Sequence, residues 1–326
     1  CVGCGAFKQD NEIVDGRCVL HPTRVLEWVE ERNWFFRLSA YADFLKAHFE
    51  AHPDFLGPAS RRNEILSLLH QGLDDVSASR ARLAWGVPFP RATSDGEVQT
   101  TYVWFDALPN YLTATGFPNA ERHQHWPAQL HVIGKDITRF HAVIWPAMLK
   151  AAELPLPERI WAHGFVNLGG ERFSKSAGVK LELGEAIDRF GPDAFRYFLM
   201  REVPFDADGN FSWERFEERY TSDLANGYGN LASRTIAMIE KYRGGVAPAI
   251  VRNDSYEADN ADIAAYVEAM NGHMLHQALE AAFRNVDAAN EYVTRQAPWK
   301  QAKDPALAAA LDETLATLAR KLAIET

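Results

Sequence analysis

The sequence predicts an α/β domain built on a parallel sheet, followed by an all-α bundle and preceded by a small zinc-knuckle segment. Three observations predict this fold class. Short apolar runs alternate with helical patterns between Thr100 and Gly184, as in parallel sheets. Helical periodicity dominates from there to the C-terminal end, and all three cysteines fall within the first eighteen residues.

Composition limits the class of protein. The chain has 326 residues, of which 47% are hydrophobic and 12% aromatic, enough for a large core and two domains. No apolar run approaches the ~20 residues that span a bilayer, and no signal-peptide pattern opens the chain, so we expect a cytoplasmic protein that does not contact membranes. A net charge of −10 argues against broad, non-specific nucleic-acid binding but leaves room for local basic patches.

Two knuckles open the sequence. Cys1 and Cys4 are separated by two residues, as are Cys18 and His21. Three thiolates and one imidazole form a tetrahedral structural zinc set. The alternative is a redox pair with a spare cysteine and an incidental histidine, but the two knuckles use every cysteine, which favours one structural zinc ion.

Two helices are expected after the knuckles. Ser39 is a suitable N-cap for the first helix, which Pro53 ends. The second covers residues 61–71, between an N-cap at Ser60 and a terminating glycine, Gly72.

Three strands with helices between them are expected from Tyr102 onward. The apolar runs are 102–105, 130–133 and 160–166, and aspartates follow the first two at positions suited to helix caps. Ligands of parallel sheets bind outside the carboxyl ends of the strands. We therefore expect a binding site formed by residues 104–106, 134–136 and 163–165.

The remainder predicts helices. Gly191-Pro192 separates two of them, and a long helix runs from Ser212 to about Tyr242. After a polar linker come helices at 261–297 and 305–323. Such a run of helices is typical of a bundle.

The stretch Gly170-Glu-Arg-Phe-Ser-Lys-Ser-Ala-Gly-Val179 brackets a lysine with hydroxyl residues and glycines. A lysine on a glycine-flanked loop beside strand ends can neutralise charge that develops on a phosphate. The same composition also suits a solvated basic surface loop, and the spacing alone leaves both interpretations open.

This stretch and several longer motifs resemble a known family. Arg172-Phe-Ser-Lys-Ser176 resembles the K-M-S-K-S signature of class I aminoacyl-tRNA synthetases. The stretches 131–137, ending in Phe140-His141, and 102–107 resemble the methionyl family, whose zinc-bearing connective insertion the knuckles resemble. The likeness runs from Cys1 to beyond Trp299. It implies a partial Rossmann-type parallel sheet with a zinc-knuckle insertion, followed by an α-helical anticodon-binding bundle.

The resemblance implies roles in amino-acid activation. ATP with Mg²⁺ is the implied substrate, and Lys175 is the mobile signature lysine, although Arg172 replaces the usual first lysine and Phe173 the usual methionine. The other implied signature residues are Ser174 and Ser176. The implied ATP-binding residues are Gly134, Lys135, Asp136, His163, Phe165 and Val166.

The resemblance also implies binding of methionine and of tRNA(Met). The methionine side chain is expected between Trp104, Ala107, Tyr111, Ile137 and His141, because a thioether favours aromatic edges. From the residues alone, Trp104 and Ile137 would be taken as core. The implied anticodon-reading residues are Asn230, Arg234 and Trp299. The alternative is that Trp299 is a buried core residue and the other two are a polar pair on the surface.

One family signature, H-I-G-H, is missing from the sequence. We expect a C-terminal portion whose N-terminal part is absent, inactive alone, and divided into a zinc-knuckle insertion at 1–37, the second half of the catalytic domain at 38–184 and a helical anticodon-binding part at 185–326. Two alternatives are kept: another class I synthetase, such as the leucine, valine or cysteine enzyme, and a non-catalytic tRNA-binding protein derived from a synthetase.

Overall fold

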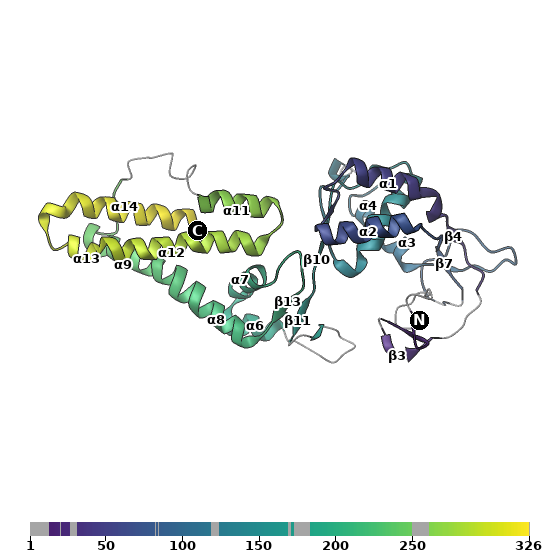
Figure 1. The fold of residues 1–326 in the computed structure, drawn as a ribbon, viewed down its shortest axis with the longest axis horizontal. Coiled ribbons are helices and arrows are strands. Elements are labelled where there is room, and N and C mark those ends of the chain that lie inside the picture. Colours follow the sequence, from purple (N-terminus) through teal and green to yellow (C-terminus); the bar gives the residue numbers. More distant parts are fainter. Residues whose placement is uncertain are drawn as a thin grey trace. The chain divides into compact units, whose positions relative to one another are not determined.

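The computed structural model describes residues 13–19, 21–26, 31–81, 83, 85–118, 124–168, 171–172, 183–249 and 261–325 (Figure 1). The chain divides into two compact units, each described by itself. The first contains residues 1–52, 65–128 and 140–157, and the second contains 53–64, 129–139 and 158–326. Among the described helices, none combines the length and the apolar character that a membrane span requires.

A small antiparallel sheet opens the first unit. It consists of β1 (Ile13–Val14), β2 (Arg17–Cys18) and β3 (His21–Val25). Cys18 is opposite His21 in the register of β2 and β3, and it is 1% exposed. Two further two-stranded sheets of this unit pair β4 (Phe35–Phe36) with β6 (Val76–Ser77) and β7 (Ser79–Arg80) with β8 (Thr100–Thr101).

The two expected N-terminal helices are present, with altered starts. A 3₁₀ turn, Leu38–Tyr41, precedes α1 (Ala42–Ala51), and α2 covers Ala59–Gln71. Ser39 does not cap α1, because its hydroxyl instead lies 2.6 Å from Oδ1 of Asp75. Ser60 lies inside α2 rather than before it. The N-cap predictions for both serines were therefore wrong.

The strand predicted at 102–105 is wrong. Those residues begin α3 (Val103–Ala107), which α4 (Asn110–Thr113) follows, and the strand before them is only β8. Asp106 therefore lies within the first turn of α3 and does not cap it. A four-residue apolar run cannot be told from a buried helical turn by its periodicity.

The apolar run after Thr138 forms the core of the first unit. A π-helical turn, Phe140–Ile144, leads into α5 (Trp145–Ala151). Trp145 is 2% exposed and packs edge-on against Trp126, with ring centroids 5.9 Å apart. This segment is buried on nearly every side, which accounts for its continuous apolar sequence.

A parallel sheet with the order β5-β10-β9 lies in the second unit, as the alternating pattern predicted. The strands are β5 (Leu56–Gly57), β10 (Ile160–His163) and β9 (His131–Gly134), and both pairings are parallel. A Cβ on Gly57 would lie 2.5 Å from the Trp161 ring, so this position has room only for glycine.

The third predicted strand is interrupted. β10 ends at His163, and the chain resumes at Val166 as β11 (Val166–Leu168) in a different sheet, with the order β12-β11-β13. Its partners are β12 (Glu171–Arg172) and β13 (Gly209–Phe211). The prediction of one strand over 160–166 was wrong because the chain changes sheets at Gly164-Phe165.

A long helix leads from this sheet into the bundle (Figure 1). It begins as α8 (Trp213–Arg219), where the Ser212 hydroxyl accepts from the Arg215 amide, continues as a π-helical segment, Tyr220–Gly229, and ends as α9 (Asn230–Arg243). The predicted N-cap at Ser212 and the long helix are confirmed. Before it come α6 (Leu183–Phe190) and α7 (Pro192–Glu202), divided at Gly191 as predicted.

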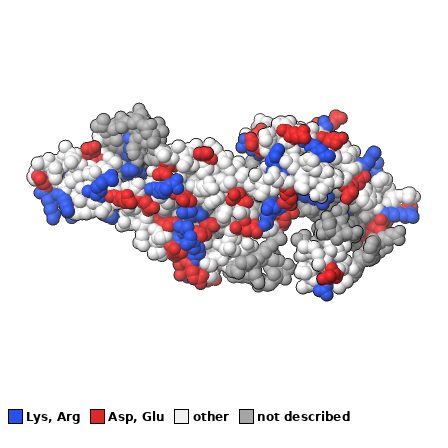
Figure 2. Space-filling view, in the orientation of Figure 1, with Lys and Arg blue, Asp and Glu red and all other residues white. Residues whose placement is uncertain are grey.

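Acidic and basic side chains alternate over α6 and α8 (Figure 2). Arg189 of α6 pairs with Glu217 of α8 at 2.5 Å, and Arg215 pairs with both Glu202 and Glu218. These pairs lie partly in solvent, so each adds little to stability. The region is balanced in charge and is not a basic patch.

The bundle is completed by α12 (Leu275–Gln296) and α14 (Ala308–Glu325), which pack against α9, and by α11 (Ala261–Asn271), which packs against α12 (Figure 1). The range predicted as one helix, 261–297, is divided by a turn at Gly272-His273-Met274. Leu231, Val286, Val293 and Leu318 form one buried cluster between the helices. Between α12 and α14 lie α13 (Pro298–Gln301) and a 3₁₀ turn (Pro305–Leu307).

Candidate functional sites

The carboxyl ends of β9 and β10 meet in register in the second unit. Gly134 is the direct partner of His163 in the parallel ladder, and each ends its strand. A 3₁₀ turn, Lys135–Ile137, follows β9, and Phe165 follows β10 after one glycine. The six residues predicted to bind a nucleotide therefore lie along two neighbouring strand ends, the position at which parallel sheets bind ligands.

Asp136 presents a carboxylate at this edge. It is exposed, and its side chain turns back towards the strand end, because a Cβ on Gly134 would lie 2.9 Å from its Oδ1. An exposed anionic acceptor at a strand end suits hydroxyl groups such as those of a ribose. The missing side chain of Gly134 leaves room for this carboxylate against the end of β9.

Lys135 connects the two strand ends to a third segment. Its Nζ lies 2.7 Å from Oδ2 of Asp208 and 4.8 Å from the centre of the Phe165 ring. The other Asp208 oxygen, Oδ1, accepts from the Phe165 amide at 2.8 Å. The hydrogen bond from Lys135 is the main cause that lowers the pKa of Asp208, and the Phe165 amide adds to the shift.

Residues 205–209, called here the 205–209 turn, wrap the end of β10. The Trp161 Nε1 donates to the Phe205 carbonyl at 3.0 Å, and the Phe205 ring lies parallel to that of His163 at 5.7 Å. The Gly209 amide donates to the Phe165 carbonyl at 2.9 Å.

The closest approach is at Gly164. A Cβ there would lie 1.9 Å from the carbonyl oxygen of Ala207. Sequence reasoning missed the contact of the 205–209 turn with the end of β10, because Asp206-Ala-Asp-Gly209 indicates a turn but not what the turn packs against.

The predicted signature loop lies mostly outside the described residues. Lys175, Ser174 and Ser176 fall in the range 173–182, which the structure does not describe. The backbone of Arg172 is described and pairs with Asn167 in the antiparallel ladder of β11 and β12. The chain thus enters the loop from β12, whose antiparallel partner β11 begins at Val166.

In the first unit, the predicted methionine-binding residues form part of an aromatic cluster. Trp104 stacks on Phe140 with ring centroids 4.0 Å apart and meets the edge of His141 at 6.1 Å. The Tyr111 hydroxyl lies 2.8 Å from Nε2 of His141. Burial raises the pKa of the Tyr111 phenol, so this group stays neutral near pH 7.

The two remaining members of the predicted methionine set are placed as follows. Ala107 ends α3, the helix that carries Trp104. Ile137 ends the 3₁₀ turn after β9 and belongs to the second unit. The aromatic cluster therefore unites Trp104, Tyr111 and His141, and each of the other two residues is half-buried in its own element.

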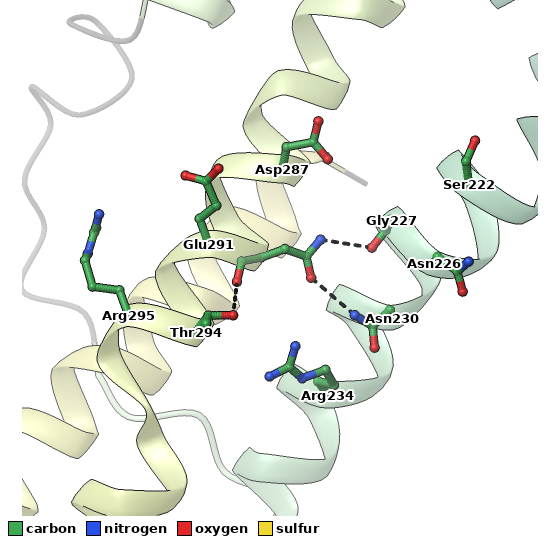
Figure 3. Close-up of a pocket in the computed structure, with 10 residues that line it drawn as sticks. Ser222, Asn226, Gly227, Asn230, Arg234, Asp287, Glu291, Thr294 and Arg295 are labelled. Carbon is green, nitrogen blue, oxygen red and sulfur yellow. Dashed lines mark hydrogen bonds between the residues drawn. The ribbon is translucent and has the colours of Figure 1, made fainter.

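A polar surface pocket of about 530 Å³ lies between α9 and α12 in the second unit (Figure 3). Asn230 and Arg234 line it from α9, and Asp287, Glu291 and Arg295 line it from α12. Burial, followed by repulsion from Asp223 and Glu291, raises the pKa of the Asp287 carboxyl. The pocket therefore offers amide and guanidinium donors beside carboxylate acceptors.

The three predicted anticodon residues lie close together. The Arg234 guanidinium lies 5.7 Å from the centre of the Trp299 ring, and Trp299 is 38% exposed. The Asn230 amide is within 3.5 Å of Oδ1 of Asn290, which in turn donates to the Gly227 carbonyl at 3.1 Å. An exposed indole beside a guanidinium is a suitable surface for stacking a flat ring.

The predicted zinc set lies mostly outside the described residues. Cys1 and Cys4 belong to the range 1–12, and the side chain of His21 is not described. Within the described parts of the chain, no group of three or more metal-ligating side chains is found. Cys18 alone is placed, buried and opposite the His21 backbone.

Comparison with known proteins gives matches along almost the whole chain. The family described as class I (M) tRNA synthetases matches residues 1–236. A methionine–tRNA ligase of Caldanaerobacter subterraneus is 43% identical over 99% of this chain and 51% of its own length. That of Brucella suis is 49% identical over 86% of this chain and 55% of its own length. The chain thus spans about half the length of these curated relatives.

Solved structures agree with these matches. The Mycobacterium tuberculosis methionyl-tRNA synthetase bound by methionyl-adenylate superposes with a TM-score of 0.89 at 41% identity, over 99% of this chain and 66% of that chain. The apo form of the same protein gives a TM-score of 0.84 over 98% of this chain and 64% of that chain.

Proposed function

Because this chain belongs to the family of class I (M) tRNA synthetases and has their fold, with a parallel sheet and a helical part, we propose that the full-length protein is a methionine–tRNA ligase. It uses ATP to convert methionine to methionyl-adenylate and then transfers the methionyl group to tRNA(Met). The observation that carries the proposal is the in-register meeting of Gly134 and His163 at two strand ends, with Asp136 and Phe165 beside them.

The strand ends hold ATP, which enters with Mg²⁺ as the substrate. Gly134 admits the nucleotide to the backbone, and Asp136 accepts hydrogen bonds from the ribose hydroxyls. The backbone near Phe165 and Val166 meets the adenine. His163 and Lys135 complete this part of the site; Lys135 already carries a positive charge beside the strand ends.

The methionine carboxylate attacks the α-phosphate, and pyrophosphate leaves. Lys175 neutralises the charge that develops on the leaving group, assisted by Arg172 and by the hydroxyls of Ser174 and Ser176. Arg172, in place of the family's first lysine, keeps the charge but presents it as a planar fork.

The methionine side chain lies against the first-unit members of the predicted set, Trp104, Ala107, Tyr111 and His141. The stacked rings around Trp104 provide the aromatic edges that a thioether prefers. An apolar slot distinguishes related side chains by only ~1–3 kcal/mol per methylene. Homocysteine is therefore the expected competitor.

tRNA(Met) is recognised through its anticodon by the pocket between α9 and α12. Trp299 stacks on an unpaired base, while Asn230 and Arg234 bond to base edges. In this proposal, residues 185–326 form the helical anticodon-binding part, 38–184 the second half of the catalytic domain, and 1–37 a connective insertion.

One structural zinc ion is proposed for that insertion. The donor set of Cys1, Cys4, Cys18 and His21 has the composition of a tetrahedral zinc site. The burial of Cys18 and its position opposite His21 are consistent with a shared ion. When bound, zinc would hold together a segment that has few apolar side chains of its own.

Methionine-dependent exchange of pyrophosphate into ATP tests the proposal in the full-length protein. We expect exchange with methionine and none with leucine, valine or cysteine. Lys175→Ala should lower the rate of adenylate formation ~10²–10³-fold, whereas Lys303→Ala, an exposed lysine after α13, should not. A loss of only a few-fold with Lys175→Ala would indicate a non-catalytic tRNA-binding protein.

The 326 residues alone are expected not to catalyse exchange. They contain no His-x-Gly-His sequence, the second signature of class I synthetases. Robust methionine-dependent exchange by these residues alone would contradict this expectation.

A further inference from the structure

We propose that Asp208 is a positioning residue for the nucleotide, holding Lys135 and the Phe165 backbone in place at the two strand ends; this rests on the proposed function. Asp208 lies on the 205–209 turn, 43 residues after Phe165 and 73 residues after Lys135. No signature motif includes it.

The geometry of the Asp208 carboxylate carries the proposal. One oxygen accepts from the Phe165 amide at 2.8 Å, and the other accepts from the Lys135 Nζ at 2.7 Å. Lys135 follows β9 directly, and Phe165 lies just past the end of β10. A single side chain therefore fastens together the two segments along which ATP is proposed to lie.

The turn that carries Asp208 is itself held firmly. Phe205 accepts from the Trp161 indole at 3.0 Å, Gly209 donates to the Phe165 carbonyl at 2.9 Å, and the backbone of Ala207 packs directly on Gly164. With both flanks fixed, the carboxylate has little freedom to leave its two donors. Pre-organised contacts of this kind place a bound ligand without further ordering.

The two interactions of the Asp208 carboxylate should contribute unequally to ATP binding. The ion pair with Lys135 is partly exposed, with Asp208 37% and Lys135 24% accessible. Loss of this ion pair should weaken the affinity for ATP by no more than about fivefold. The bond from a backbone amide to a charged acceptor is stronger, and its loss should cost about tenfold or more.

Two substitutions separate these two interactions in the full-length protein. Asp208→Asn keeps an oxygen for the Phe165 amide but removes the charge opposite Lys135, and Asp208→Ala removes both. We expect the KM for ATP in pyrophosphate exchange to rise about threefold with Asp208→Asn and about tenfold or more with Asp208→Ala, while the KM for methionine stays unchanged. Asp208→Asn should have no further effect in a Lys135→Met background.

Asp262→Asn is the matched control. Asp262 forms a similar ion pair, 2.6 Å from Arg284, and is 32% exposed, but it lies on α11. We expect its kinetics to equal those of the wild type. Unchanged KM for ATP in both Asp208 variants would overturn the proposal, as would a parallel loss for both substrates together with a lower melting temperature.

Hydrogen exchange at the Phe165 amide gives a second measurement that does not depend on catalysis. We expect faster exchange with Asp208→Ala, and near-normal exchange with Asp208→Asn and Asp262→Asn. An unchanged Phe165 amide in Asp208→Ala overturns the positioning role. A wild type without methionine-dependent exchange instead overturns the proposed function, so the two failures are distinguishable.

Discussion

Replacing Gly164 with alanine should open the junction between β10 and the 205–209 turn. The added Cβ would lie 1.9 Å from the Ala207 carbonyl oxygen, 2.2 Å from its carbon and 2.6 Å from the Asp208 amide nitrogen. All three are backbone atoms, so no side-chain rotation can relieve the overlap, and the turn must move away.

The cost follows from what that movement breaks. Overpacking by one methyl group costs about 1–3 kcal/mol, and the hydrogen bond from the Phe165 amide to the charged Asp208 carboxylate adds about 1.5–3 kcal/mol. We therefore expect the local free energy of opening at residues 161–166 to fall by about 2.5–6 kcal/mol. Hydrogen exchange of these amides in the full-length protein measures it.

Gly184→Ala is the control for this substitution. Gly184 lies in α6, and a Cβ there meets nothing within 4 Å. Alanine in place of a helical glycine should stabilise α6 by up to about 1 kcal/mol. Equal protection of residues 161–166 in wild type and Gly164→Ala would refute the packing described for the junction.

Three further predictions concern other parts of the chain. Trp299→Ala should weaken tRNA(Met) binding by about 1–3 kcal/mol, the worth of one stacked base, in a filter-binding titration, with methionine-dependent exchange unaffected. Tyr111→Phe removes the hydroxyl 2.8 Å from His141 and should raise the KM for methionine by up to about tenfold without changing that for ATP. Burial, and then His52, lowers the pKa of His48 from 6.5 to about 4; because the unfolded chain takes up the proton first, stability of the first unit should fall as the pH drops from 6.5 towards 4. His48→Gln should lessen that fall in melting temperatures measured across this range, and an identical pH profile would contradict the assignment.

Periodicity and capping residues predicted much of the second unit. The strand at β9, the helices after Gly184 and the N-cap at Ser212 are all present. These elements have either a continuous apolar run or a side chain that satisfies a helix end locally. The helix ends depend on residues close in sequence. The strand β9 pairs with the distant β10, but its apolar run alone marks it as a strand.

Contacts between residues far apart in sequence could not be predicted from periodicity and capping residues. Ser39 bonds to Asp75 instead of capping its helix, and the strand predicted at Tyr102 is a helix. The short apolar run at 102–105 fits a strand and a helical turn equally well, whereas for Ser39 a partner far away in sequence decides the local structure. Asp208 is the same kind of case, because its importance arises only when the 205–209 turn meets β10.

The π-helical segment between α8 and α9 has a consequence for the pocket. Each residue of an α-helix turns the chain by about 100°, so deleting one residue from Tyr220–Gly229 would rotate the whole of α9 relative to α8. Asn230 and Arg234 would then turn away from α12 although neither had been altered. Which side chains face the pocket between α9 and α12 is therefore governed by the winding of a segment that precedes them.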